Sequence, residues 1–126
     1  MIEGIDHVVL AVRDLDRATA IYARVLNMQV ETFAKTRKAL MAGDQKINLQ
    51  VIGQENRNHA CIGSGDICLL TRHSPAEVRD RLEAEGVAIL EGPFEKTGAL
   101  GPITSVYFND PDGNLVEVSS YAKTIS

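Results

Sequence analysis

Hydrophobic and polar residues follow one another along the chain in an order that predicts short strands and single helices, and that order occurs twice. Residues 5–13 predict a strand that places Val8, Leu10 and Val12 on one face and His7 on the other. Asp14 is a suitable N-cap for the next segment, 15–26, whose apolar residues recur at three- and four-residue spacing and predict a helix. Three further strands are predicted at about 29–34, 37–42 and 46–52.

The same order begins again after residues 53–64, a polar, glycine-containing segment that we interpret as a linker. A strand is predicted at 66–72, and the capping box Ser74-Pro75-Ala76-Glu77 then begins a helix that ends near Glu85, before Gly86. The turn Asp110-Pro111-Asp112-Gly113 separates the last two of three more predicted strands, near 87–91, 103–109 and 114–120. The sequence thus predicts two βαβββ modules, at about 1–52 and 65–126.

Polar residues occupy corresponding places in the two modules, on the first and the last strand of each. The first strand begins with His7 in one module and Asp66 in the other, and the last strand carries Asn48 and Gln50 or Glu117. Because side chains alternate between faces, the apolar set can face the helix and leave this polar set on the opposite face. Imidazole, carboxylate and amide groups together suit a divalent metal, although a simple solvated sheet face explains the same pattern.

Composition narrows the class of protein. The 126 residues carry a net charge of −4, which argues against a nucleic-acid-binding protein. No apolar run approaches the roughly 20 residues of a membrane span, and residues 1–4 lack the features of a signal peptide, so we expect a cytoplasmic protein without membrane contact. Cys61 and Cys68 do not have the spacing of a zinc or redox motif, and we expect both thiols to be reduced and without a chemical role.

Two segments of the sequence carry a recognisable pattern: Ile5-Asp6-His7-Val8-Val9-Leu10 with Asp14-Leu15, and Phe108-Asn109-Asp110-Pro111-Asp112-Gly113-Asn114-Leu115-Val116-Glu117. In these segments the chain resembles the vicinal-oxygen-chelate superfamily, which includes glyoxalase I, bleomycin-resistance proteins and extradiol dioxygenases. Residues 37–40, 45–49 and 97–105 are most similar to short glyoxalase-domain proteins, some of them bacterial virulence proteins. The resemblance implies a single α+β domain over 1–126, with tandem βαβββ modules forming a curved mixed sheet with a cavity. It also implies a homodimer, in which modules can be exchanged between subunits.

The resemblance also implies a set of metal ligands. His7 and Glu117 match the family's ligand positions, whereas Asp66 stands where metal-binding members usually have histidine. On the last strand of the first module, Asn48 or Gln50 must serve as the metal ligand. We therefore predict His7, Gln50, Asp66 and Glu117 as ligands of Mn, Fe, Ni or Zn, with loss of the metal and retention of a cavity as the alternative.

From the resemblance we expect a metal-dependent lyase or isomerase that stabilises an enolate-type intermediate on a small oxygenated substrate. Glu117 is the candidate base, with Asp66 as the second choice. The glycine-rich segment 96–102 is expected to be a loop that closes over the substrate, and the predicted substrate-binding residues are Asn48, Arg37, Lys96 and Ser105. The alternative is a non-catalytic binding protein of the bleomycin-resistance type; a dioxygenase is disfavoured because Asp66 replaces a histidine.

Overall fold

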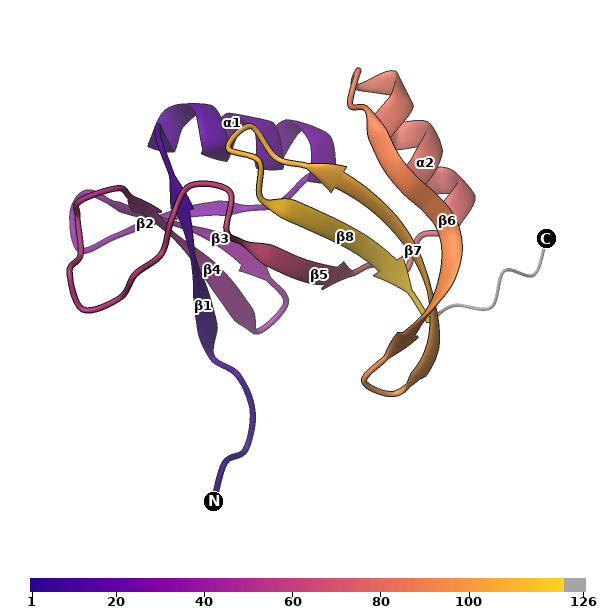
Figure 1. Cartoon of the computed structure of the whole chain (residues 1–126), viewed down its shortest axis with the longest axis horizontal. Helices are drawn as coiled ribbons and strands as arrows, with labels where there is room; N and C mark the ends of the chain where they lie inside the picture. The colour runs from indigo at the N-terminus through magenta and orange to yellow at the C-terminus, as the bar shows by residue number, and fades with distance from the viewer. Residues whose placement is uncertain (122–126) are drawn as a thin grey trace. The chain divides into compact units, whose positions relative to one another are not determined.

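The computed structural model describes residues 1–121 and contains the predicted elements in the predicted order (Figure 1). The first module consists of β1 (His7–Val12), α1 (Leu15–Leu26), β2 (Val30–Phe33), β3 (Arg37–Ala42) and β4 (Gln45–Val51). The second consists of β5 (Asp66–Leu70), α2 (Pro75–Ala84), β6 (Ile89–Gly98), β7 (Gly101–Asn109) and β8 (Leu115–Ser120). The α+β class and the tandem βαβββ modules are therefore confirmed.

The chain divides into two compact units, and each unit is built from two separate stretches of the sequence. The first unit comprises residues 1–65 together with 110–114, and the second comprises 66–109 and the strand β8. The segment 53–64 and the turn between β7 and β8 therefore both belong to the first unit.

Each unit contains one four-stranded mixed sheet. The strand order is β1-β4-β3-β2 in the first and β5-β8-β7-β6 in the second, and in each the first two strands are parallel and the others antiparallel. Helix α1 packs against β3 and β4, and helix α2 packs against β6, β7 and β8. In each sheet the helix covers one face, and we call the opposite side the open face.

Strand register decides which residues share the open face. In the first sheet Val9 is paired with Asn48 and Ala11 with Gln50, while His7 is paired with Lys46. Ala39 on β3 is also paired with Asn48, so Arg37, two residues earlier, lies on the same face. The predicted grouping of His7, Asn48 and Gln50 on one face is therefore confirmed.

A buried carboxylate organises the first unit. Asp110 is 5% exposed, and its Oδ2 accepts hydrogen bonds from the Tyr22 hydroxyl at 2.7 Å and from Asn114 Nδ2 at 2.9 Å. Its Oδ1 accepts the backbone N–H groups of Asp112 and Asn114, each at 2.9 Å. Burial, together with the charge and hydrogen bond of Asp110, raises the pKa of Tyr22 far above its ordinary value. The side chain of Asp110, the first residue of the turn, thus stabilises the turn through hydrogen bonds to its backbone.

Asn114 extends this network to two other segments. Its Nδ2 also donates to the carbonyl oxygen of Ala11 at 3.2 Å, and its Oδ1 accepts the backbone N–H of Gly65 at 2.8 Å. A Cβ atom on Gly65 would lie 2.6 Å from Leu10 Cδ2 and 2.7 Å from Asn114 Oδ1. The absence of a side chain at Gly65 is therefore what permits this bond.

The prediction of a loop at 96–102 is wrong. Strand β6 continues to Gly98 and β7 begins at Gly101, so these residues form the tip of a β-hairpin whose turn is Ala99-Leu100. Glycine and proline are typical of loops, but here Gly101 adopts a positive φ of 128° beside the turn and Pro102 lies near the start of its strand. The strand predicted at 87–91 is correspondingly too short.

We predict that Asp110→Asn lowers the free energy of unfolding by about 1–3 kcal/mol, because an NH₂ group would replace an oxygen that accepts buried donors. Asp14→Asn is the matched control. Asp14 caps α1 by accepting the Arg17 N–H at 3.0 Å, and Asn caps helices as well as Asp does, so this variant should stay within about 0.5 kcal/mol. Urea unfolding measures both. Equal effects of the two substitutions would contradict the assigned role of Asp110.

Candidate functional site

Glu117 lies at the centre of a cluster of hydroxyl groups on the open face of the second sheet. Ser105 Oγ donates to Glu117 Oε2 at 2.5 Å, and Ser119 Oγ approaches the same oxygen at 3.3 Å. The two serine hydroxyls are 2.7 Å apart, and both serines are at most 1% exposed. One carboxylate oxygen is therefore fixed by two buried hydroxyl groups, which orients the whole group.

Strand pairing places these residues together. Glu117 is paired with Cys68 on β5 and with Tyr107 on β7, while Ser119 is paired with Ser105. Strand β6 approaches this region closely at Gly92, which has a φ of 102° and where a Cβ atom would lie 2.3 Å from the Ser105 carbonyl oxygen. Glycine at position 92 is thus required by the close approach of two backbones beside Ser105.

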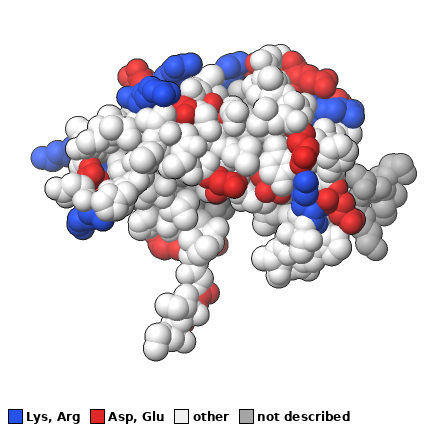
Figure 2. Space-filling view, in the orientation of Figure 1, with Lys and Arg blue, Asp and Glu red and all other residues white. Residues whose placement is uncertain are grey.

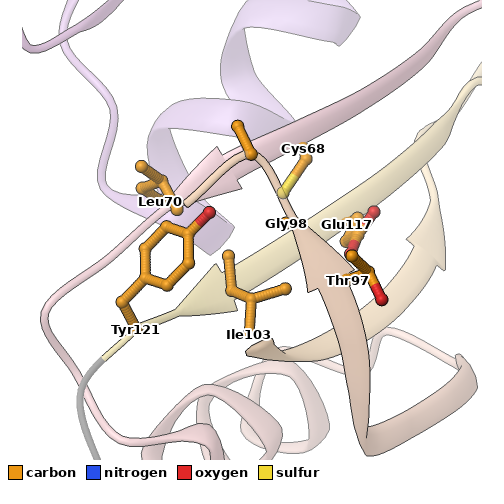
Figure 3. A pocket seen from close by; sticks show the side chains of 8 residues that line it. Cys68, Leu70, Thr97, Gly98, Ile103, Glu117 and Tyr121 are labelled. Atoms are coloured by element: carbon orange, nitrogen blue, oxygen red, sulfur yellow. The ribbon is translucent and has the colours of Figure 1, made fainter. Parts of the chain in front are cut away.

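A pocket of about 350 Å³ adjoins Glu117 in the second unit (Figure 3). Leu70 and Ile103 give it apolar walls, and Tyr121 stands opposite the hairpin tip. Its full lining is Cys68, Leu70, Thr97, Gly98, Ala99, Ile103, Glu117 and Tyr121. The Tyr121 hydroxyl accepts the Leu100 N–H at 3.0 Å, and a Cβ atom on Gly98 would lie 2.3 Å from that hydroxyl. The pocket can therefore hold a small, largely apolar molecule next to one carboxylate.

The charge of Glu117 affects the pKa values of two other side chains, Tyr107 and Cys68. Burial raises the pKa of Tyr107 to about 12, with further contributions from its hydrogen bond to Glu117 and from that charge. Burial likewise raises the pKa of the Cys68 thiol, and the charges of Glu117 and Asp66 add to this effect. The hydrogen bond between Cys68 Sγ and Ser119 Oγ, which are 3.2 Å apart, lowers the pKa of Cys68, because the hydroxyl group can donate to the thiolate. Cys68 and Tyr107 are thus held in their neutral, protonated forms.

The predicted site residues of the first unit differ in whether their polar atoms already have hydrogen-bond partners. His7 is partly exposed, and its Nδ1 lies 2.8 Å from Asp6 Oδ1. Gln50 and Asn58 exchange two amide hydrogen bonds, both of 3.1 Å, so a ligand would have to displace Asn58. Asn48 Oδ1 and Arg37 Nε, by contrast, are buried and have no hydrogen-bond partner among residues 1–121. Of the two candidate amides, Asn48 is the one with an unused oxygen.

The remaining predicted residues lie in the second unit. Asp66 is exposed at the start of β5, on the same face as Cys68 and Glu117. Lys96 forms an ion pair of 2.6 Å with Glu91, and its Nζ lies 5.4 Å from the centroid of the Tyr107 ring. Within residues 1–121, no three His, Cys, Asp or Glu side chains gather as a group that would hold a metal ion. His7 and Gln50 belong to one unit and Asp66 and Glu117 to the other.

Sequence reasoning did not select Ser119, Tyr107 or Cys68 as site residues. Ser119 follows Glu117 at the two-residue spacing of one strand face, a signal that was present in the sequence. Tyr107 and Cys68 lie on other strands, and only the observed register with Glu117 reveals them.

A family model of the Glyoxalase/Bleomycin resistance protein/Dioxygenase superfamily matches residues 4–118. The chain belongs to this superfamily. Within the superfamily it is 42% identical to the glyoxalase domain-containing protein RDO1 of Mycosarcoma maydis over 123 residues, which is 95% of this chain and 69% of the relative. It is also 42% identical to virulence protein STM3117 of Salmonella typhimurium over 124 residues, 96% of this chain and 86% of the relative.

Solved structures of superfamily relatives agree with the fold. The crystal structure of STM3117 matches with a TM-score of 0.90 and covers 97% of this chain and 99% of its own. An integron cassette protein of V. cholerae matches with a TM-score of 0.91 at 44% identity, covering 97% of this chain and 98% of its own. The resemblance to short glyoxalase-domain proteins, including a bacterial virulence protein, is therefore confirmed.

The surface of this superfamily member carries charges of both signs. In the space-filling view, acidic and basic side chains are interspersed over the visible face (Figure 2). None of the helices within residues 1–121 has the length and apolar character needed to cross a membrane.

We predict that Glu117→Gln increases the rate of Cys68 alkylation by iodoacetamide at pH 8 about threefold. Removing the carboxylate charge lowers the pKa of the thiol, so a larger fraction is thiolate at that pH. Ser119→Ala should slow the reaction, because the Cys68 thiolate loses a hydroxyl donor that lowers the pKa of the thiol. Mass spectrometry separates Cys68 from Cys61. Glu95→Gln, an exposed position paired with Thr104, is the control, and an equal acceleration there would contradict the assignment.

Proposed function

We propose that this chain is a lyase or isomerase of the glyoxalase class in which Glu117 moves a proton on a small oxygenated substrate. The observation that supports it most directly is the carboxylate of Glu117, oriented by Ser105 at 2.5 Å and adjoining a pocket of about 350 Å³. A carboxylate held beside a mainly apolar cavity is suited to general base chemistry. The name of the relative RDO1 as a glyoxalase domain-containing protein is in keeping with this class.

The proposed reaction on an α-hydroxycarbonyl compound needs no external oxidant or reductant. Glu117 takes the proton from the carbon that bears the hydroxyl group, and the C–H electron pair moves towards the carbonyl oxygen to give an enolate. The hydroxyl proton shifts to that oxygen, and protonated Glu117 returns its proton to the former carbonyl carbon. Ser105 and Ser119 keep the carboxylate in one orientation throughout. Asp66, on the same face, is the second candidate for the base.

We also propose that the chain binds a divalent metal ion. The imidazole of His7 and the carboxylates of Asp66 and Glu117 are donors of the right chemistry, whereas Gln50 would have to give up both bonds to Asn58. A bound ion would supply Lewis acidity and stabilise negative charge on a substrate oxygen.

We predict that full-length protein catalyses exchange of a substrate C–H proton with D₂O, followed by NMR on hydroxyacetone, dihydroxyacetone and a hemithioacetal. Glu117→Gln should lower the rate at least about 100-fold, and Ser105→Ala should lower it less because the base remains. Glu95→Gln should leave it unchanged. Undiminished exchange in Glu117→Gln would contradict the role of Glu117. Saturable binding without exchange in the wild-type protein would instead favour the non-catalytic binding protein.

Metal content provides a separate prediction. After purified protein is supplied with Mn, Fe, Ni or Zn, elemental mass spectrometry should find about one ion per chain, lost in His7→Ala and in Glu117→Ala. His73→Ala is the matched control, because His73 is exposed and lies 3.0 Å from Glu77 beside the start of α2. Gln50→Ala tests the amide ligand. Retention of the ion in both His7→Ala and Glu117→Ala would contradict the proposed ligands.

A further inference from the structure

The pocket beside Glu117 has an apolar part that is separate from the carboxylate. In the close-up view, Leu70 and Tyr121 lie to one side of Ile103 and Glu117 lies to the other (Figure 3). Ile103 is 3% exposed and forms an inner wall, whereas Leu70 is 66% exposed and forms an outer one. The Tyr121 hydroxyl accepts the Leu100 N–H at 3.0 Å, which holds the aromatic ring against the hairpin tip. A ligand in this pocket therefore contacts a carboxylate at one end and apolar side chains at the other.

The charged side chains on the strands of this face are mostly acidic. Asp66 on β5 and Glu91 on β6 share the face with Glu117, as the strand register shows. Lys96 is the only basic side chain on strands β5 to β8, and its Nζ lies 2.6 Å from Glu91. A negatively charged group that entered the pocket would be repelled by Glu117, and the nearest strand cation already has an acidic partner.

We propose that the pocket takes an uncharged α-hydroxycarbonyl compound with a short alkyl group, and that it rejects analogues whose alkyl end is replaced by an anionic group. The proposal rests on the proposed function, which places the hydroxycarbonyl end beside Glu117. The alkyl end lies against Leu70, Ile103 and the Tyr121 ring, where burial of apolar surface favours binding. A carboxylate at that end would exchange water for apolar contacts, which is unfavourable.

Three compounds with the same number of non-hydrogen atoms test this substrate class. They share a hydroxyketone end, whereas 1-hydroxy-5-methylhexan-2-one ends in an isopropyl group, 5-hydroxy-4-oxopentanamide in a neutral amide and 5-hydroxy-4-oxopentanoate in a carboxylate. Full-length protein is titrated with each by calorimetry or NMR at constant ionic strength, in EDTA so that no metal ion alters the charge of the pocket. We expect the isopropyl compound to bind at least about tenfold more tightly than the carboxylate, with the amide between them. Equal or tighter binding of the carboxylate would overturn the proposal, as would the absence of saturable binding.

A cation on the outer wall of the pocket should reverse this preference. Leu70→Lys keeps an aliphatic stem and adds a positive charge, so the carboxylate compound should bind about tenfold more tightly than it does to the wild-type protein. Leu90→Lys is the matched control, because Leu90 is 56% exposed on β6 and does not line the pocket. The control should leave the ratio of the two dissociation constants unchanged. An equal shift in both variants would indicate an effect of net charge alone and overturn the proposal.

Glu117→Gln tests the repulsion directly. Removing the charge should tighten binding of the carboxylate compound about threefold or more and leave binding of the isopropyl compound nearly unchanged. An unchanged ratio in Glu117→Gln, together with an unchanged ratio in Leu70→Lys, would overturn the proposal. If Glu117→Gln does not fold, Leu70→Lys decides.

Exchange with D₂O at the carbon that bears the hydroxyl group separates this proposal from the proposed function. It is followed by NMR on the isopropyl compound, after the protein has been supplied with a divalent metal. Selective binding of the isopropyl compound without exchange would support the ligand class and contradict proton transfer by Glu117. Exchange without selective binding would support proton transfer and overturn the ligand class.

Discussion

The buried carboxylate of Asp110 is the constraint on which the arrangement of the strands depends. Four donors converge on it, including the Tyr22 hydroxyl and the side-chain amide of Asn114. Asn114 in turn accepts the N–H of Gly65. Gly65 and Asn114 immediately precede β5 and β8, so this single bond brings the beginnings of two parallel strands together, and the register of Asp66 with Leu115 follows. Because the pairing of Cys68 with Glu117 lies two positions further along, a shift at the turn would displace the candidate site.

Polar residues on the open faces differ in whether the described chain satisfies their hydrogen bonds. Glu117 has its serine hydroxyl groups, and Gln50 has Asn58. These groups are oriented by the protein itself, as a catalytic group must be if it is to act without rearrangement. Asn48 Oδ1 and Arg37 Nε are also buried, but the part of the chain that the structure describes offers them no hydrogen-bond partner. A buried polar atom without a hydrogen-bond partner lowers the stability of the folded state.

Much of the fold could be predicted from the sequence, because local signals and hydrophobic periodicity agreed. Ser74 and Glu77 form the predicted capping box, and α1 has the predicted bounds. The extension of the strands predicted near 87–91 and 103–109 into one hairpin could not be predicted, because Gly98, Gly101 and Pro102 have low strand propensity and pair only by virtue of their neighbours. Similarly, the alternation of side chains placed His7, Asn48 and Gln50 on one face, but it could not show which amide oxygen remains unpaired.

The sequence by itself determined the two βαβββ modules, the superfamily and the strand faces that carry polar residues, since each follows from periodicity or from contiguous motifs such as Asp110-Pro111-Asp112-Gly113. Only the tertiary structure decided which residues meet. It placed the turn at 110–114 in the first unit and joined Ser105, Glu117 and Ser119 into one cluster. Within the described residues, it also left Arg37 Nε and Asn48 Oδ1 without a hydrogen-bond partner. The physical reason is that hydrogen-bond partners far apart in sequence are fixed by strand register and by packing, and neither is encoded in the spacing of residues along one strand.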